Sequence, residues 1–212
     1  VAAEVLSFAD AVRLVERRGQ LMQQAVPEGQ GAMAAILGLG DEQIIELCAA
    51  ASQGQVVSAV NFNAPGQVVI AGVTDAVARA IDACKDAGAK RAIALPVSVP
   101  SHCALMQPAA EQLSVDFAAL QWQKPGITLV QNVTARPAAD VADLRQLLVE
   151  QLYSPVRWVE SVIYMAEQGV TDLVECGPGK VLGGLNKRCS KAVNNHSLDS
   201  VASFAAFSEQ FA

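Results

Sequence analysis

The 212-residue sequence predicts an α/β protein in which a smaller domain interrupts a larger one. Two observations carry this prediction. Segments with the period of helices alternate with short apolar segments typical of strands along most of the chain. The residues are 52% hydrophobic and 17% charged, so the chain can bury a sizeable core. Alternation of strands with helices favours a sandwich whose strands are mostly parallel.

The first predicted helix runs from Phe8 to Ala25, with Ser7 as its N-cap. At about 100° per residue its apolar side chains fall on one arc. That arc consists of Phe8, Ala11, Val12, Leu14, Val15, Leu21, Met22 and Ala25. Arg18 projects into the middle of the arc, where an unpaired guanidinium is costly to bury. Two explanations stay open at this point: an internal salt bridge to a core carboxylate, or contact with an anionic ligand.

Residues 29–98 are predicted to form the smaller domain. The expected elements are a strand at 31–39, a helix at 42–51 capped by Asp41, strands at 56–62 and 67–71, a helix at 75–87 capped by Thr74, and a strand at 91–97. A β-α-β-β-α-β order is that of a ferredoxin-like split βαβ unit. This unit divides the larger domain into residues 1–28 and 99–212.

The larger domain resumes with a helix that ends near residue 120. A buried strand is expected at 127–132, helices at 142–152 and 158–168, a strand at 170–175 and a helix at 181–188. The tail after Lys191 has no predicted element.

Composition excludes several functions. A formal charge of −6 argues against nucleic-acid binding, which needs a basic face. No apolar run reaches the roughly 18–20 residues of a membrane span, so we expect a soluble protein. Five scattered cysteines without a C-x-x-C pair predict free thiols in the cytoplasm, with neither a disulfide framework nor a metal site. The chain begins with Val1 rather than Met, and we expect that this is not the natural amino terminus.

Few residues can carry chemistry. His102 lies in a loop that leaves the smaller domain, where a histidine can serve as a general base. It can equally be a half-buried imidazole that bonds a backbone carbonyl. The other histidine, His196, lies in the polar tail. No G-x-S-x-G pentapeptide, the nucleophile elbow of α/β-type acyl-transfer enzymes, occurs in these residues.

Five sequence blocks resemble one family over about residues 6 to 188. The blocks are Phe8-Ala-Asp-Ala-Val-Arg-Leu-Val-Glu-Arg-Arg-Gly19, Gly31-Ala-Met-Ala-Ala35, Asn61-Phe-Asn-Ala-Pro-Gly-Gln-Val-Val-Ile-Ala-Gly72, Pro96-Val-Ser-Val-Pro-Ser-His-Cys-Ala-Leu-Met106 and Glu175-Cys-Gly-Pro-Gly-Lys-Val-Leu182. They are similar to the malonyl-CoA:acyl carrier protein transacylases of bacterial type II fatty acid synthesis.

The resemblance implies an α/β-hydrolase-like large domain interrupted by a ferredoxin-like small domain. It implies a cytoplasmic enzyme without a cofactor, whose partners are malonyl-CoA and acyl carrier protein. By position, His102 resembles the general base, and Arg18 the arginine that pairs with the free malonyl carboxylate. Gln151 matches the residue whose backbone carbonyl holds the histidine ring. Asn63 lies in a block that borders the cleft, and we expect it to bind substrate.

The family's Gly-His-Ser-Leu-Gly elbow corresponds to a position upstream of Val1, so we expect the chain alone to be inactive. An alternative is a non-catalytic fragment that binds carrier protein through a basic patch. The patch residues are Lys90, Arg91, Lys187, Arg188 and Lys191.

Overall fold

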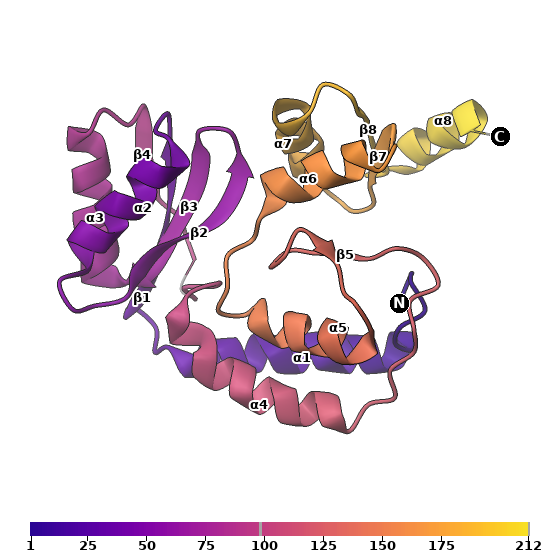
Figure 1. The fold of residues 1–212 in the computed structure, drawn as a ribbon, viewed down its shortest axis with the longest axis horizontal. Coiled ribbons are helices and arrows are strands. Elements are labelled where there is room, and N and C mark those ends of the chain that lie inside the picture. The colour runs from indigo at the N-terminus through magenta and orange to yellow at the C-terminus, as the bar shows by residue number, and fades with distance from the viewer. Residues whose placement is uncertain (98, 212) are drawn as a thin grey trace.

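The computed structural model describes residues 1–97 and 99–211 (Figure 1). The helices are α1 (Phe8–Ala25), α2 (Asp41–Ser52), α3 (Thr74–Asp86), η1 (Ala104–Met106), α4 (Gln107–Ala118), α5 (Val141–Glu150), α6 (Trp158–Glu167), α7 (Val181–Cys189) and α8 (Val201–Phe211). The strands are β1 (Gly31–Leu37), β2 (Val57–Ala64), β3 (Gln67–Val73), β4 (Arg91–Ala94), β5 (Val130–Gln131), β6 (Arg136–Pro137), β7 (Asp172–Glu175) and β8 (Asn194–Ser197). The predicted domain boundary at residue 98 falls outside the described residues.

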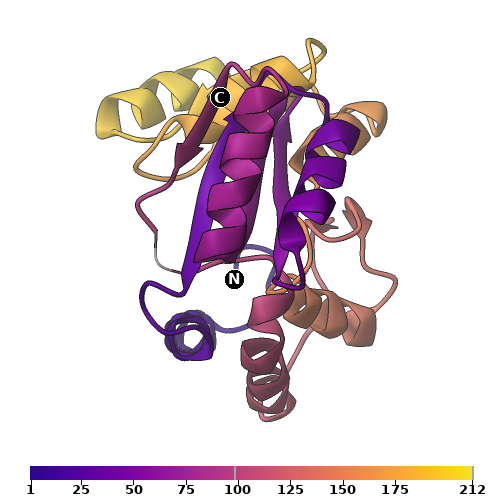
Figure 2. The same ribbon diagram turned by 90° about the vertical axis from the view of Figure 1, so that its left-hand side faces the viewer.

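The four strands β1 to β4 form one sheet in the order β2-β3-β1-β4. Helices α2 and α3 lie together on one face of this sheet (Figure 2). Ile36, Ile44 and Val77 are fully buried between the sheet and these helices. The elements of this unit therefore occur in the β-α-β-β-α-β order that the sequence predicts.

The mostly parallel strands predicted from the alternation of strands and helices are not found in this four-stranded sheet. Each neighbouring pair in the four-stranded sheet is antiparallel. The two-residue connection at Pro65 and Gly66 joins β2 to β3 and forces them to run in opposite directions. Strands linked through a helix, β1 with β2 and β3 with β4, are not neighbours in the sheet. Among the named strands of residues 1–97 and 99–211, only β7 and β8 pair in parallel.

The second face of the sheet packs against the loop that carries His102. Met33, Val60 and Ala71 form a buried cluster there with Cys103. At the end of β1, Gly31 lies so close to Pro100 that an added Cβ would sit 2.4 Å from the proline Cδ. The sheet therefore supports the loop of the candidate base.

Helix α1 has the predicted bounds, and the Ser7 hydroxyl accepts a hydrogen bond from the Asp10 amide, as an N-cap does. Its apolar arc is only half covered. Leu21 and Met22 are buried in a cluster with residues of α4, whereas Phe8 is 72% exposed and Val15 67% exposed. The apolar arc of α1 is therefore not a continuous buried face, because Phe8 and Val15 remain exposed.

Two of the predicted helix caps are wrong. Gly40 is the N-cap of α2, and Asp41 is the first helical residue. Val73 is the N-cap of α3, while the Thr74 hydroxyl donates to the Gly29 carbonyl at 2.7 Å. Thr74 thus ties the helix to the chain that enters β1.

The strands of the larger unit are shorter than predicted. The strand expected at 127–132 pairs only at Val130 and Gln131 with β6, and Ile127 is 61% exposed. The tail contains two elements for which no prediction was made, β8 and α8. No helix within residues 1–97 and 99–211 is both long and apolar enough to cross a membrane.

Gly72 is expected to be one of the least replaceable residues of the sheet. An added Cβ would lie 2.0 Å from the Val56 carbonyl oxygen and 2.6 Å from the Val57 Cα. Because both atoms are backbone, relief requires β2 and β3 to separate. Gly72→Ala is expected to lower the free energy of unfolding by about 3 kcal/mol, at the upper end of typical overpacking costs.

Chemical denaturation of the two proteins measures this loss. Gly184→Ala is the matched control, since nothing lies within 4 Å of its added Cβ in α7. That change is expected to stabilise by about 0.5–1 kcal/mol. Equal stability of Gly72→Ala and the parent would contradict the close approach of β2 to β3.

Candidate active site

Three of the four predicted site residues line one cavity of about 440 Å³. Arg18 comes from α1, His102 from the loop before η1, and Gln151 from the residue that follows α5. The remaining wall is largely apolar. It consists of Leu6, Leu14, Val15, Leu113, Phe117, Trp122, Asn132, Leu148 and Val156. A cation and an imidazole therefore share a cavity with few competing polar groups.

Backbone and side-chain contacts both hold His102 at the end of α5. Its amide donates to the Leu152 carbonyl at 2.9 Å, and its Nδ1 lies 2.6 Å from the Gln151 carbonyl oxygen. Because a carbonyl can only accept, the neutral ring carries its proton on Nδ1, which leaves Nε2 as the basic nitrogen. The backbone φ of His102 is +65°, an uncommon conformation for a residue other than glycine. Such local strain concentrates at functional sites.

The pKa of His102 lies below its ordinary value. Burial of the ring is the largest cause, since it disfavours the charged form. The hydrogen bond to the Gln151 carbonyl raises the pKa, and the positive charge of Arg18 lowers it. The imidazole is therefore neutral at pH 7 and able to accept a proton.

Arg18 has no acidic partner among the described residues. It is half-buried, and burial lowers the pKa of its guanidinium. Its neighbour Arg17, by contrast, donates from Nε to the Asp116 carboxylate at 3.0 Å. The internal salt bridge considered for Arg18 is thus not observed within residues 1–97 and 99–211, and the cavity next to His102 can take an anion.

Asn63 does not line this cavity. It lies in β2, and its carbonyl accepts a hydrogen bond from the Cys189 thiol at 3.6 Å. Strand β2 does reach the cavity wall, because the Phe62 amide donates to the Val156 carbonyl. The role predicted for Asn63 in substrate binding stays a prediction.

Asn132 is a site residue that the sequence analysis missed. It follows β5, lines the cavity, and accepts a 2.7 Å hydrogen bond at Oδ1 from Gln151 Nε2. A polar residue at the end of a predicted buried strand is a signal that could have found it, since α/β proteins place sites at strand ends.

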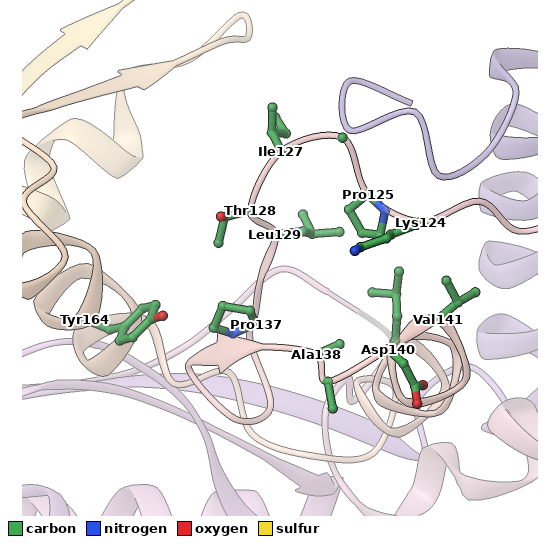
Figure 3. A pocket seen from close by; sticks show the side chains of 13 residues that line it. Lys124, Pro125, Ile127, Thr128, Leu129, Pro137, Ala138, Asp140, Val141 and Tyr164 are labelled. Carbon is green, nitrogen blue, oxygen red and sulfur yellow. The ribbon is translucent and has the colours of Figure 1, made fainter.

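A larger cavity lies elsewhere and offers less chemistry. It measures about 610 Å³ and lies between the 124–129 segment, residues 137–141 and Tyr164 (Figure 3). Its lining residues include neither histidine nor cysteine. The carboxylate of Asp140 already caps α5 by accepting from the Asp143 amide. We therefore place the candidate site at His102 in spite of the smaller volume there.

Comparison with known proteins shows that the protein is of the acyl transferase class, since the family model of the acyl transferase domain matches residues 1–203. The malonyl CoA-acyl carrier protein transacylase of Haemophilus influenzae is 58% identical over 209 residues, which are 99% of this chain and 67% of the relative. The enzyme of that name from Escherichia coli K12 is 57% identical over 206 residues, 97% of this chain and 67% of the relative. The chain therefore belongs to the malonyl CoA-acyl carrier protein transacylase family.

Solved structures agree with this assignment. The crystal structure of an acyl carrier protein S-malonyltransferase from Vibrio cholerae superimposes with a TM-score of 0.95 at 56% identity. The superposition covers 97% of this chain and 67% of the Vibrio cholerae chain. The structure of a type II PKS acyl-carrier protein in complex with its malonyl-transacylase matches with a TM-score of 0.96 at 52% identity. This match covers 98% of this chain and 67% of that one. The match shows an α/β fold of this family, and the chain spans about two thirds of the length of these relatives.

Proposed function

We propose that this chain supplies the general base and the carboxylate-binding arginine of a malonyl-CoA:acyl carrier protein malonyltransferase. The observation that carries the proposal is the pairing of Arg18 and His102 in one cavity, where the guanidinium has no acidic partner within the described residues. A malonyl group carries a free carboxylate beside its thioester, and guanidinium binds carboxylates bidentately. The proposal thus assigns one group to each end of the acyl unit.

The reaction proceeds in two halves. His102 Nε2 takes the proton of a serine hydroxyl, and the serine oxygen attacks the thioester carbonyl. The C–S bond breaks, the sulfur of CoA leaves with the proton from His102, and malonyl remains as an ester on serine. In the second half His102 deprotonates the phosphopantetheine thiol of the carrier protein. The thiolate attacks the ester carbonyl, the C–O bond to serine breaks, malonyl leaves as the thioester of the carrier protein, and the proton passes from His102 to the serine oxygen.

The nucleophilic serine is proposed to lie in the third of the family's length that this chain does not span. No G-x-S-x-G sequence occurs in the 212 residues. The donors that stabilise the oxyanion are assigned to the same third. Loss of one such donor alone typically costs about 10²–10³ in rate, so the chain by itself is expected to be inactive.

The domain division accompanies this proposal. Residues 29–98 are assigned to a ferredoxin-like small domain, and residues 1–28 and 99–212 to an α/β-hydrolase-like large domain. The buried cluster from Ala34 to Cys84 supports the first assignment, because all its core members lie between these two residues. A cytoplasmic location fits the three fully buried, reduced thiols of Cys48, Cys84 and Cys103.

The non-catalytic alternative is weaker. One member of its proposed basic patch, Arg188, is engaged within the chain, where it donates to the Gln67 side chain and at 2.7 Å to the Pro65 carbonyl. The alternative also does not explain why a cation and a candidate base line the same cavity.

Acyl transfer to the protein tests the proposal. The gene that encodes this chain is expected to encode a Gly-x-Ser-x-Gly elbow before Val1. The complete gene product is expected to gain the mass of one malonyl group on incubation with malonyl-CoA, and the 212-residue chain none. A gene without the elbow, or a complete product that stays unacylated, would contradict the transferase proposal. Acylation of the chain alone would refute the assignment of the nucleophile.

A further inference from the structure

Gln151 is held at both of its polar ends. Its carbonyl oxygen lies 2.6 Å from His102 Nδ1, and its side-chain Nε2 donates to Asn132 Oδ1 at 2.7 Å. It is the C-cap of α5, so its carbonyl belongs to the last helical carbonyls, which have no partner within the helix. A carbonyl at this position is free to accept from the histidine ring.

A helix end is also where the backbone is least constrained, because terminal turns fray. Asn132 limits this freedom from a different segment. Its own carbonyl accepts from the Arg157 amide at 3.0 Å, which fixes the residue that follows β5. The Gln151 side chain is therefore anchored to a point that does not move with α5.

We propose that Asn132 is a positioning residue for His102, because it fixes Gln151 so that the Gln151 carbonyl holds the ring with its proton on Nδ1 and Nε2 free for proton transfer. This inference rests on the proposed function, in which His102 is the base. Asn132 acts through Gln151 and need not touch the reacting atoms.

The state of the His102 ring can be measured in the 212-residue chain without any acyl transfer. The chain has only two histidines, so nitrogen-15 NMR spectra of the imidazoles contain two sets of signals. His196 serves as an internal reference for folding, since its Nε2 lies 2.9 Å from the Asp172 carboxylate between β8 and β7. The spectra give the ratio of the two neutral tautomers and the pKa of His102.

Asn132→Ala and Gln151→Ala are expected to lower the Nδ1–H to Nε2–H ratio of His102 to a similar extent. A typical net hydrogen-bond strength makes this change about 2- to 10-fold. Because the bond to Gln151 raises the pKa of His102, its weakening is expected to lower that pKa further in both variants. The double variant is expected to match either single variant, as required of two residues that act through one link.

Two further variants serve as controls. Gln146→Ala removes a comparable 2.8 Å side-chain bond on the exposed face of α5, to Glu150, and is expected to leave His102 unchanged. Asn132→Asp keeps the acceptor for Gln151 and is expected to retain the parental tautomer.

The outcomes separate the two proposals. A parent protein with the His102 proton on Nε2 would contradict the base assignment itself. A parent with the expected tautomer whose Asn132→Ala and Gln151→Ala spectra match those of Gln146→Ala would overturn the positioning role alone. Additive effects in the double variant would also overturn it. Unchanged His196 signals show that a variant is folded.

Discussion

Arg18→Ala in the complete gene product is expected to lower kcat/KM for malonyl-CoA by roughly 30-fold to several thousand-fold. Removal of one partner from a desolvated, hydrogen-bonded charge pair costs about 2–5 kcal/mol, which sets this range. Acetyl-CoA has no free carboxylate, so its slow transfer is expected to stay the same or improve. Competition between the two thioesters, with the acyl group on the protein identified by mass, measures the change in preference.

Arg17→Ala is the matched control on the same helix. Its guanidinium is already paired with Asp116, so its loss is expected to leave the malonyl preference intact. Surface pairs of this kind contribute little to stability, typically under about 1 kcal/mol. An Arg18→Ala enzyme that still prefers malonyl would refute the carboxylate-binding role.

His102→Ala is expected to slow acyl transfer by about 10²- to 10⁴-fold, the usual contribution of a general base. His196→Ala, which replaces the other histidine, is expected to retain the transfer rate. Pre-steady-state acylation by malonyl-CoA measures both, since it isolates the step in which the base removes the serine proton. Similar rates for the two variants would contradict the assignment of His102.

The pH dependence follows from the lowered pKa of His102. Because only the neutral ring can accept a proton, the acylation rate is expected to rise with pH through a pKa below the ordinary histidine value of about 6.5 and to be flat above it. The free energy of unfolding is also expected to rise with pH. The unfolded chain binds the His102 proton more tightly than the folded chain, so the contribution of neutral His102 to stability is lost as pH falls below about 6.5. His102→Ala is expected to remove both dependences.

Local patterns predicted the elements that are stabilised locally. Helix α1 begins and ends at the predicted residues, because a capping serine and a 3.6-residue apolar period define it without reference to the rest of the chain. The β-α-β-β-α-β order could also be predicted from local sequence patterns. The direction of neighbouring strands could not be predicted in this way, since it depends on β3 lying between β1 and β2.

Elements that depend on distant partners were predicted poorly. The apolar segment 127–132 suits a buried strand, yet only Val130 and Gln131 find a strand partner in the described part of the chain. In the tail, β8 is polar in sequence and forms because β7 offers it a parallel edge. Propensity alone does not reveal such tertiary effects.

The site shows the same division. Arg18 was conspicuous because a cation interrupted an apolar arc, and His102 because histidines are scarce. Gln151 came from resemblance alone, since its role uses a backbone carbonyl that every residue has. Asn132 was overlooked because its importance lies in one hydrogen bond to a residue 19 positions away.

The most direct test of the account is binding of malonyl-CoA to the complete gene product, followed by NMR of the Arg18 guanidinium and the His102 ring. Malonyl-CoA is expected to shift the Arg18 Nε–H signal and the His102 signals together, whereas acetyl-CoA shifts the His102 signals and leaves Arg18 in place. If malonyl-CoA bound without moving the Arg18 signal, or if acetyl-CoA moved it equally, Arg18 would not be the carboxylate partner and the proposed function would lose its main support.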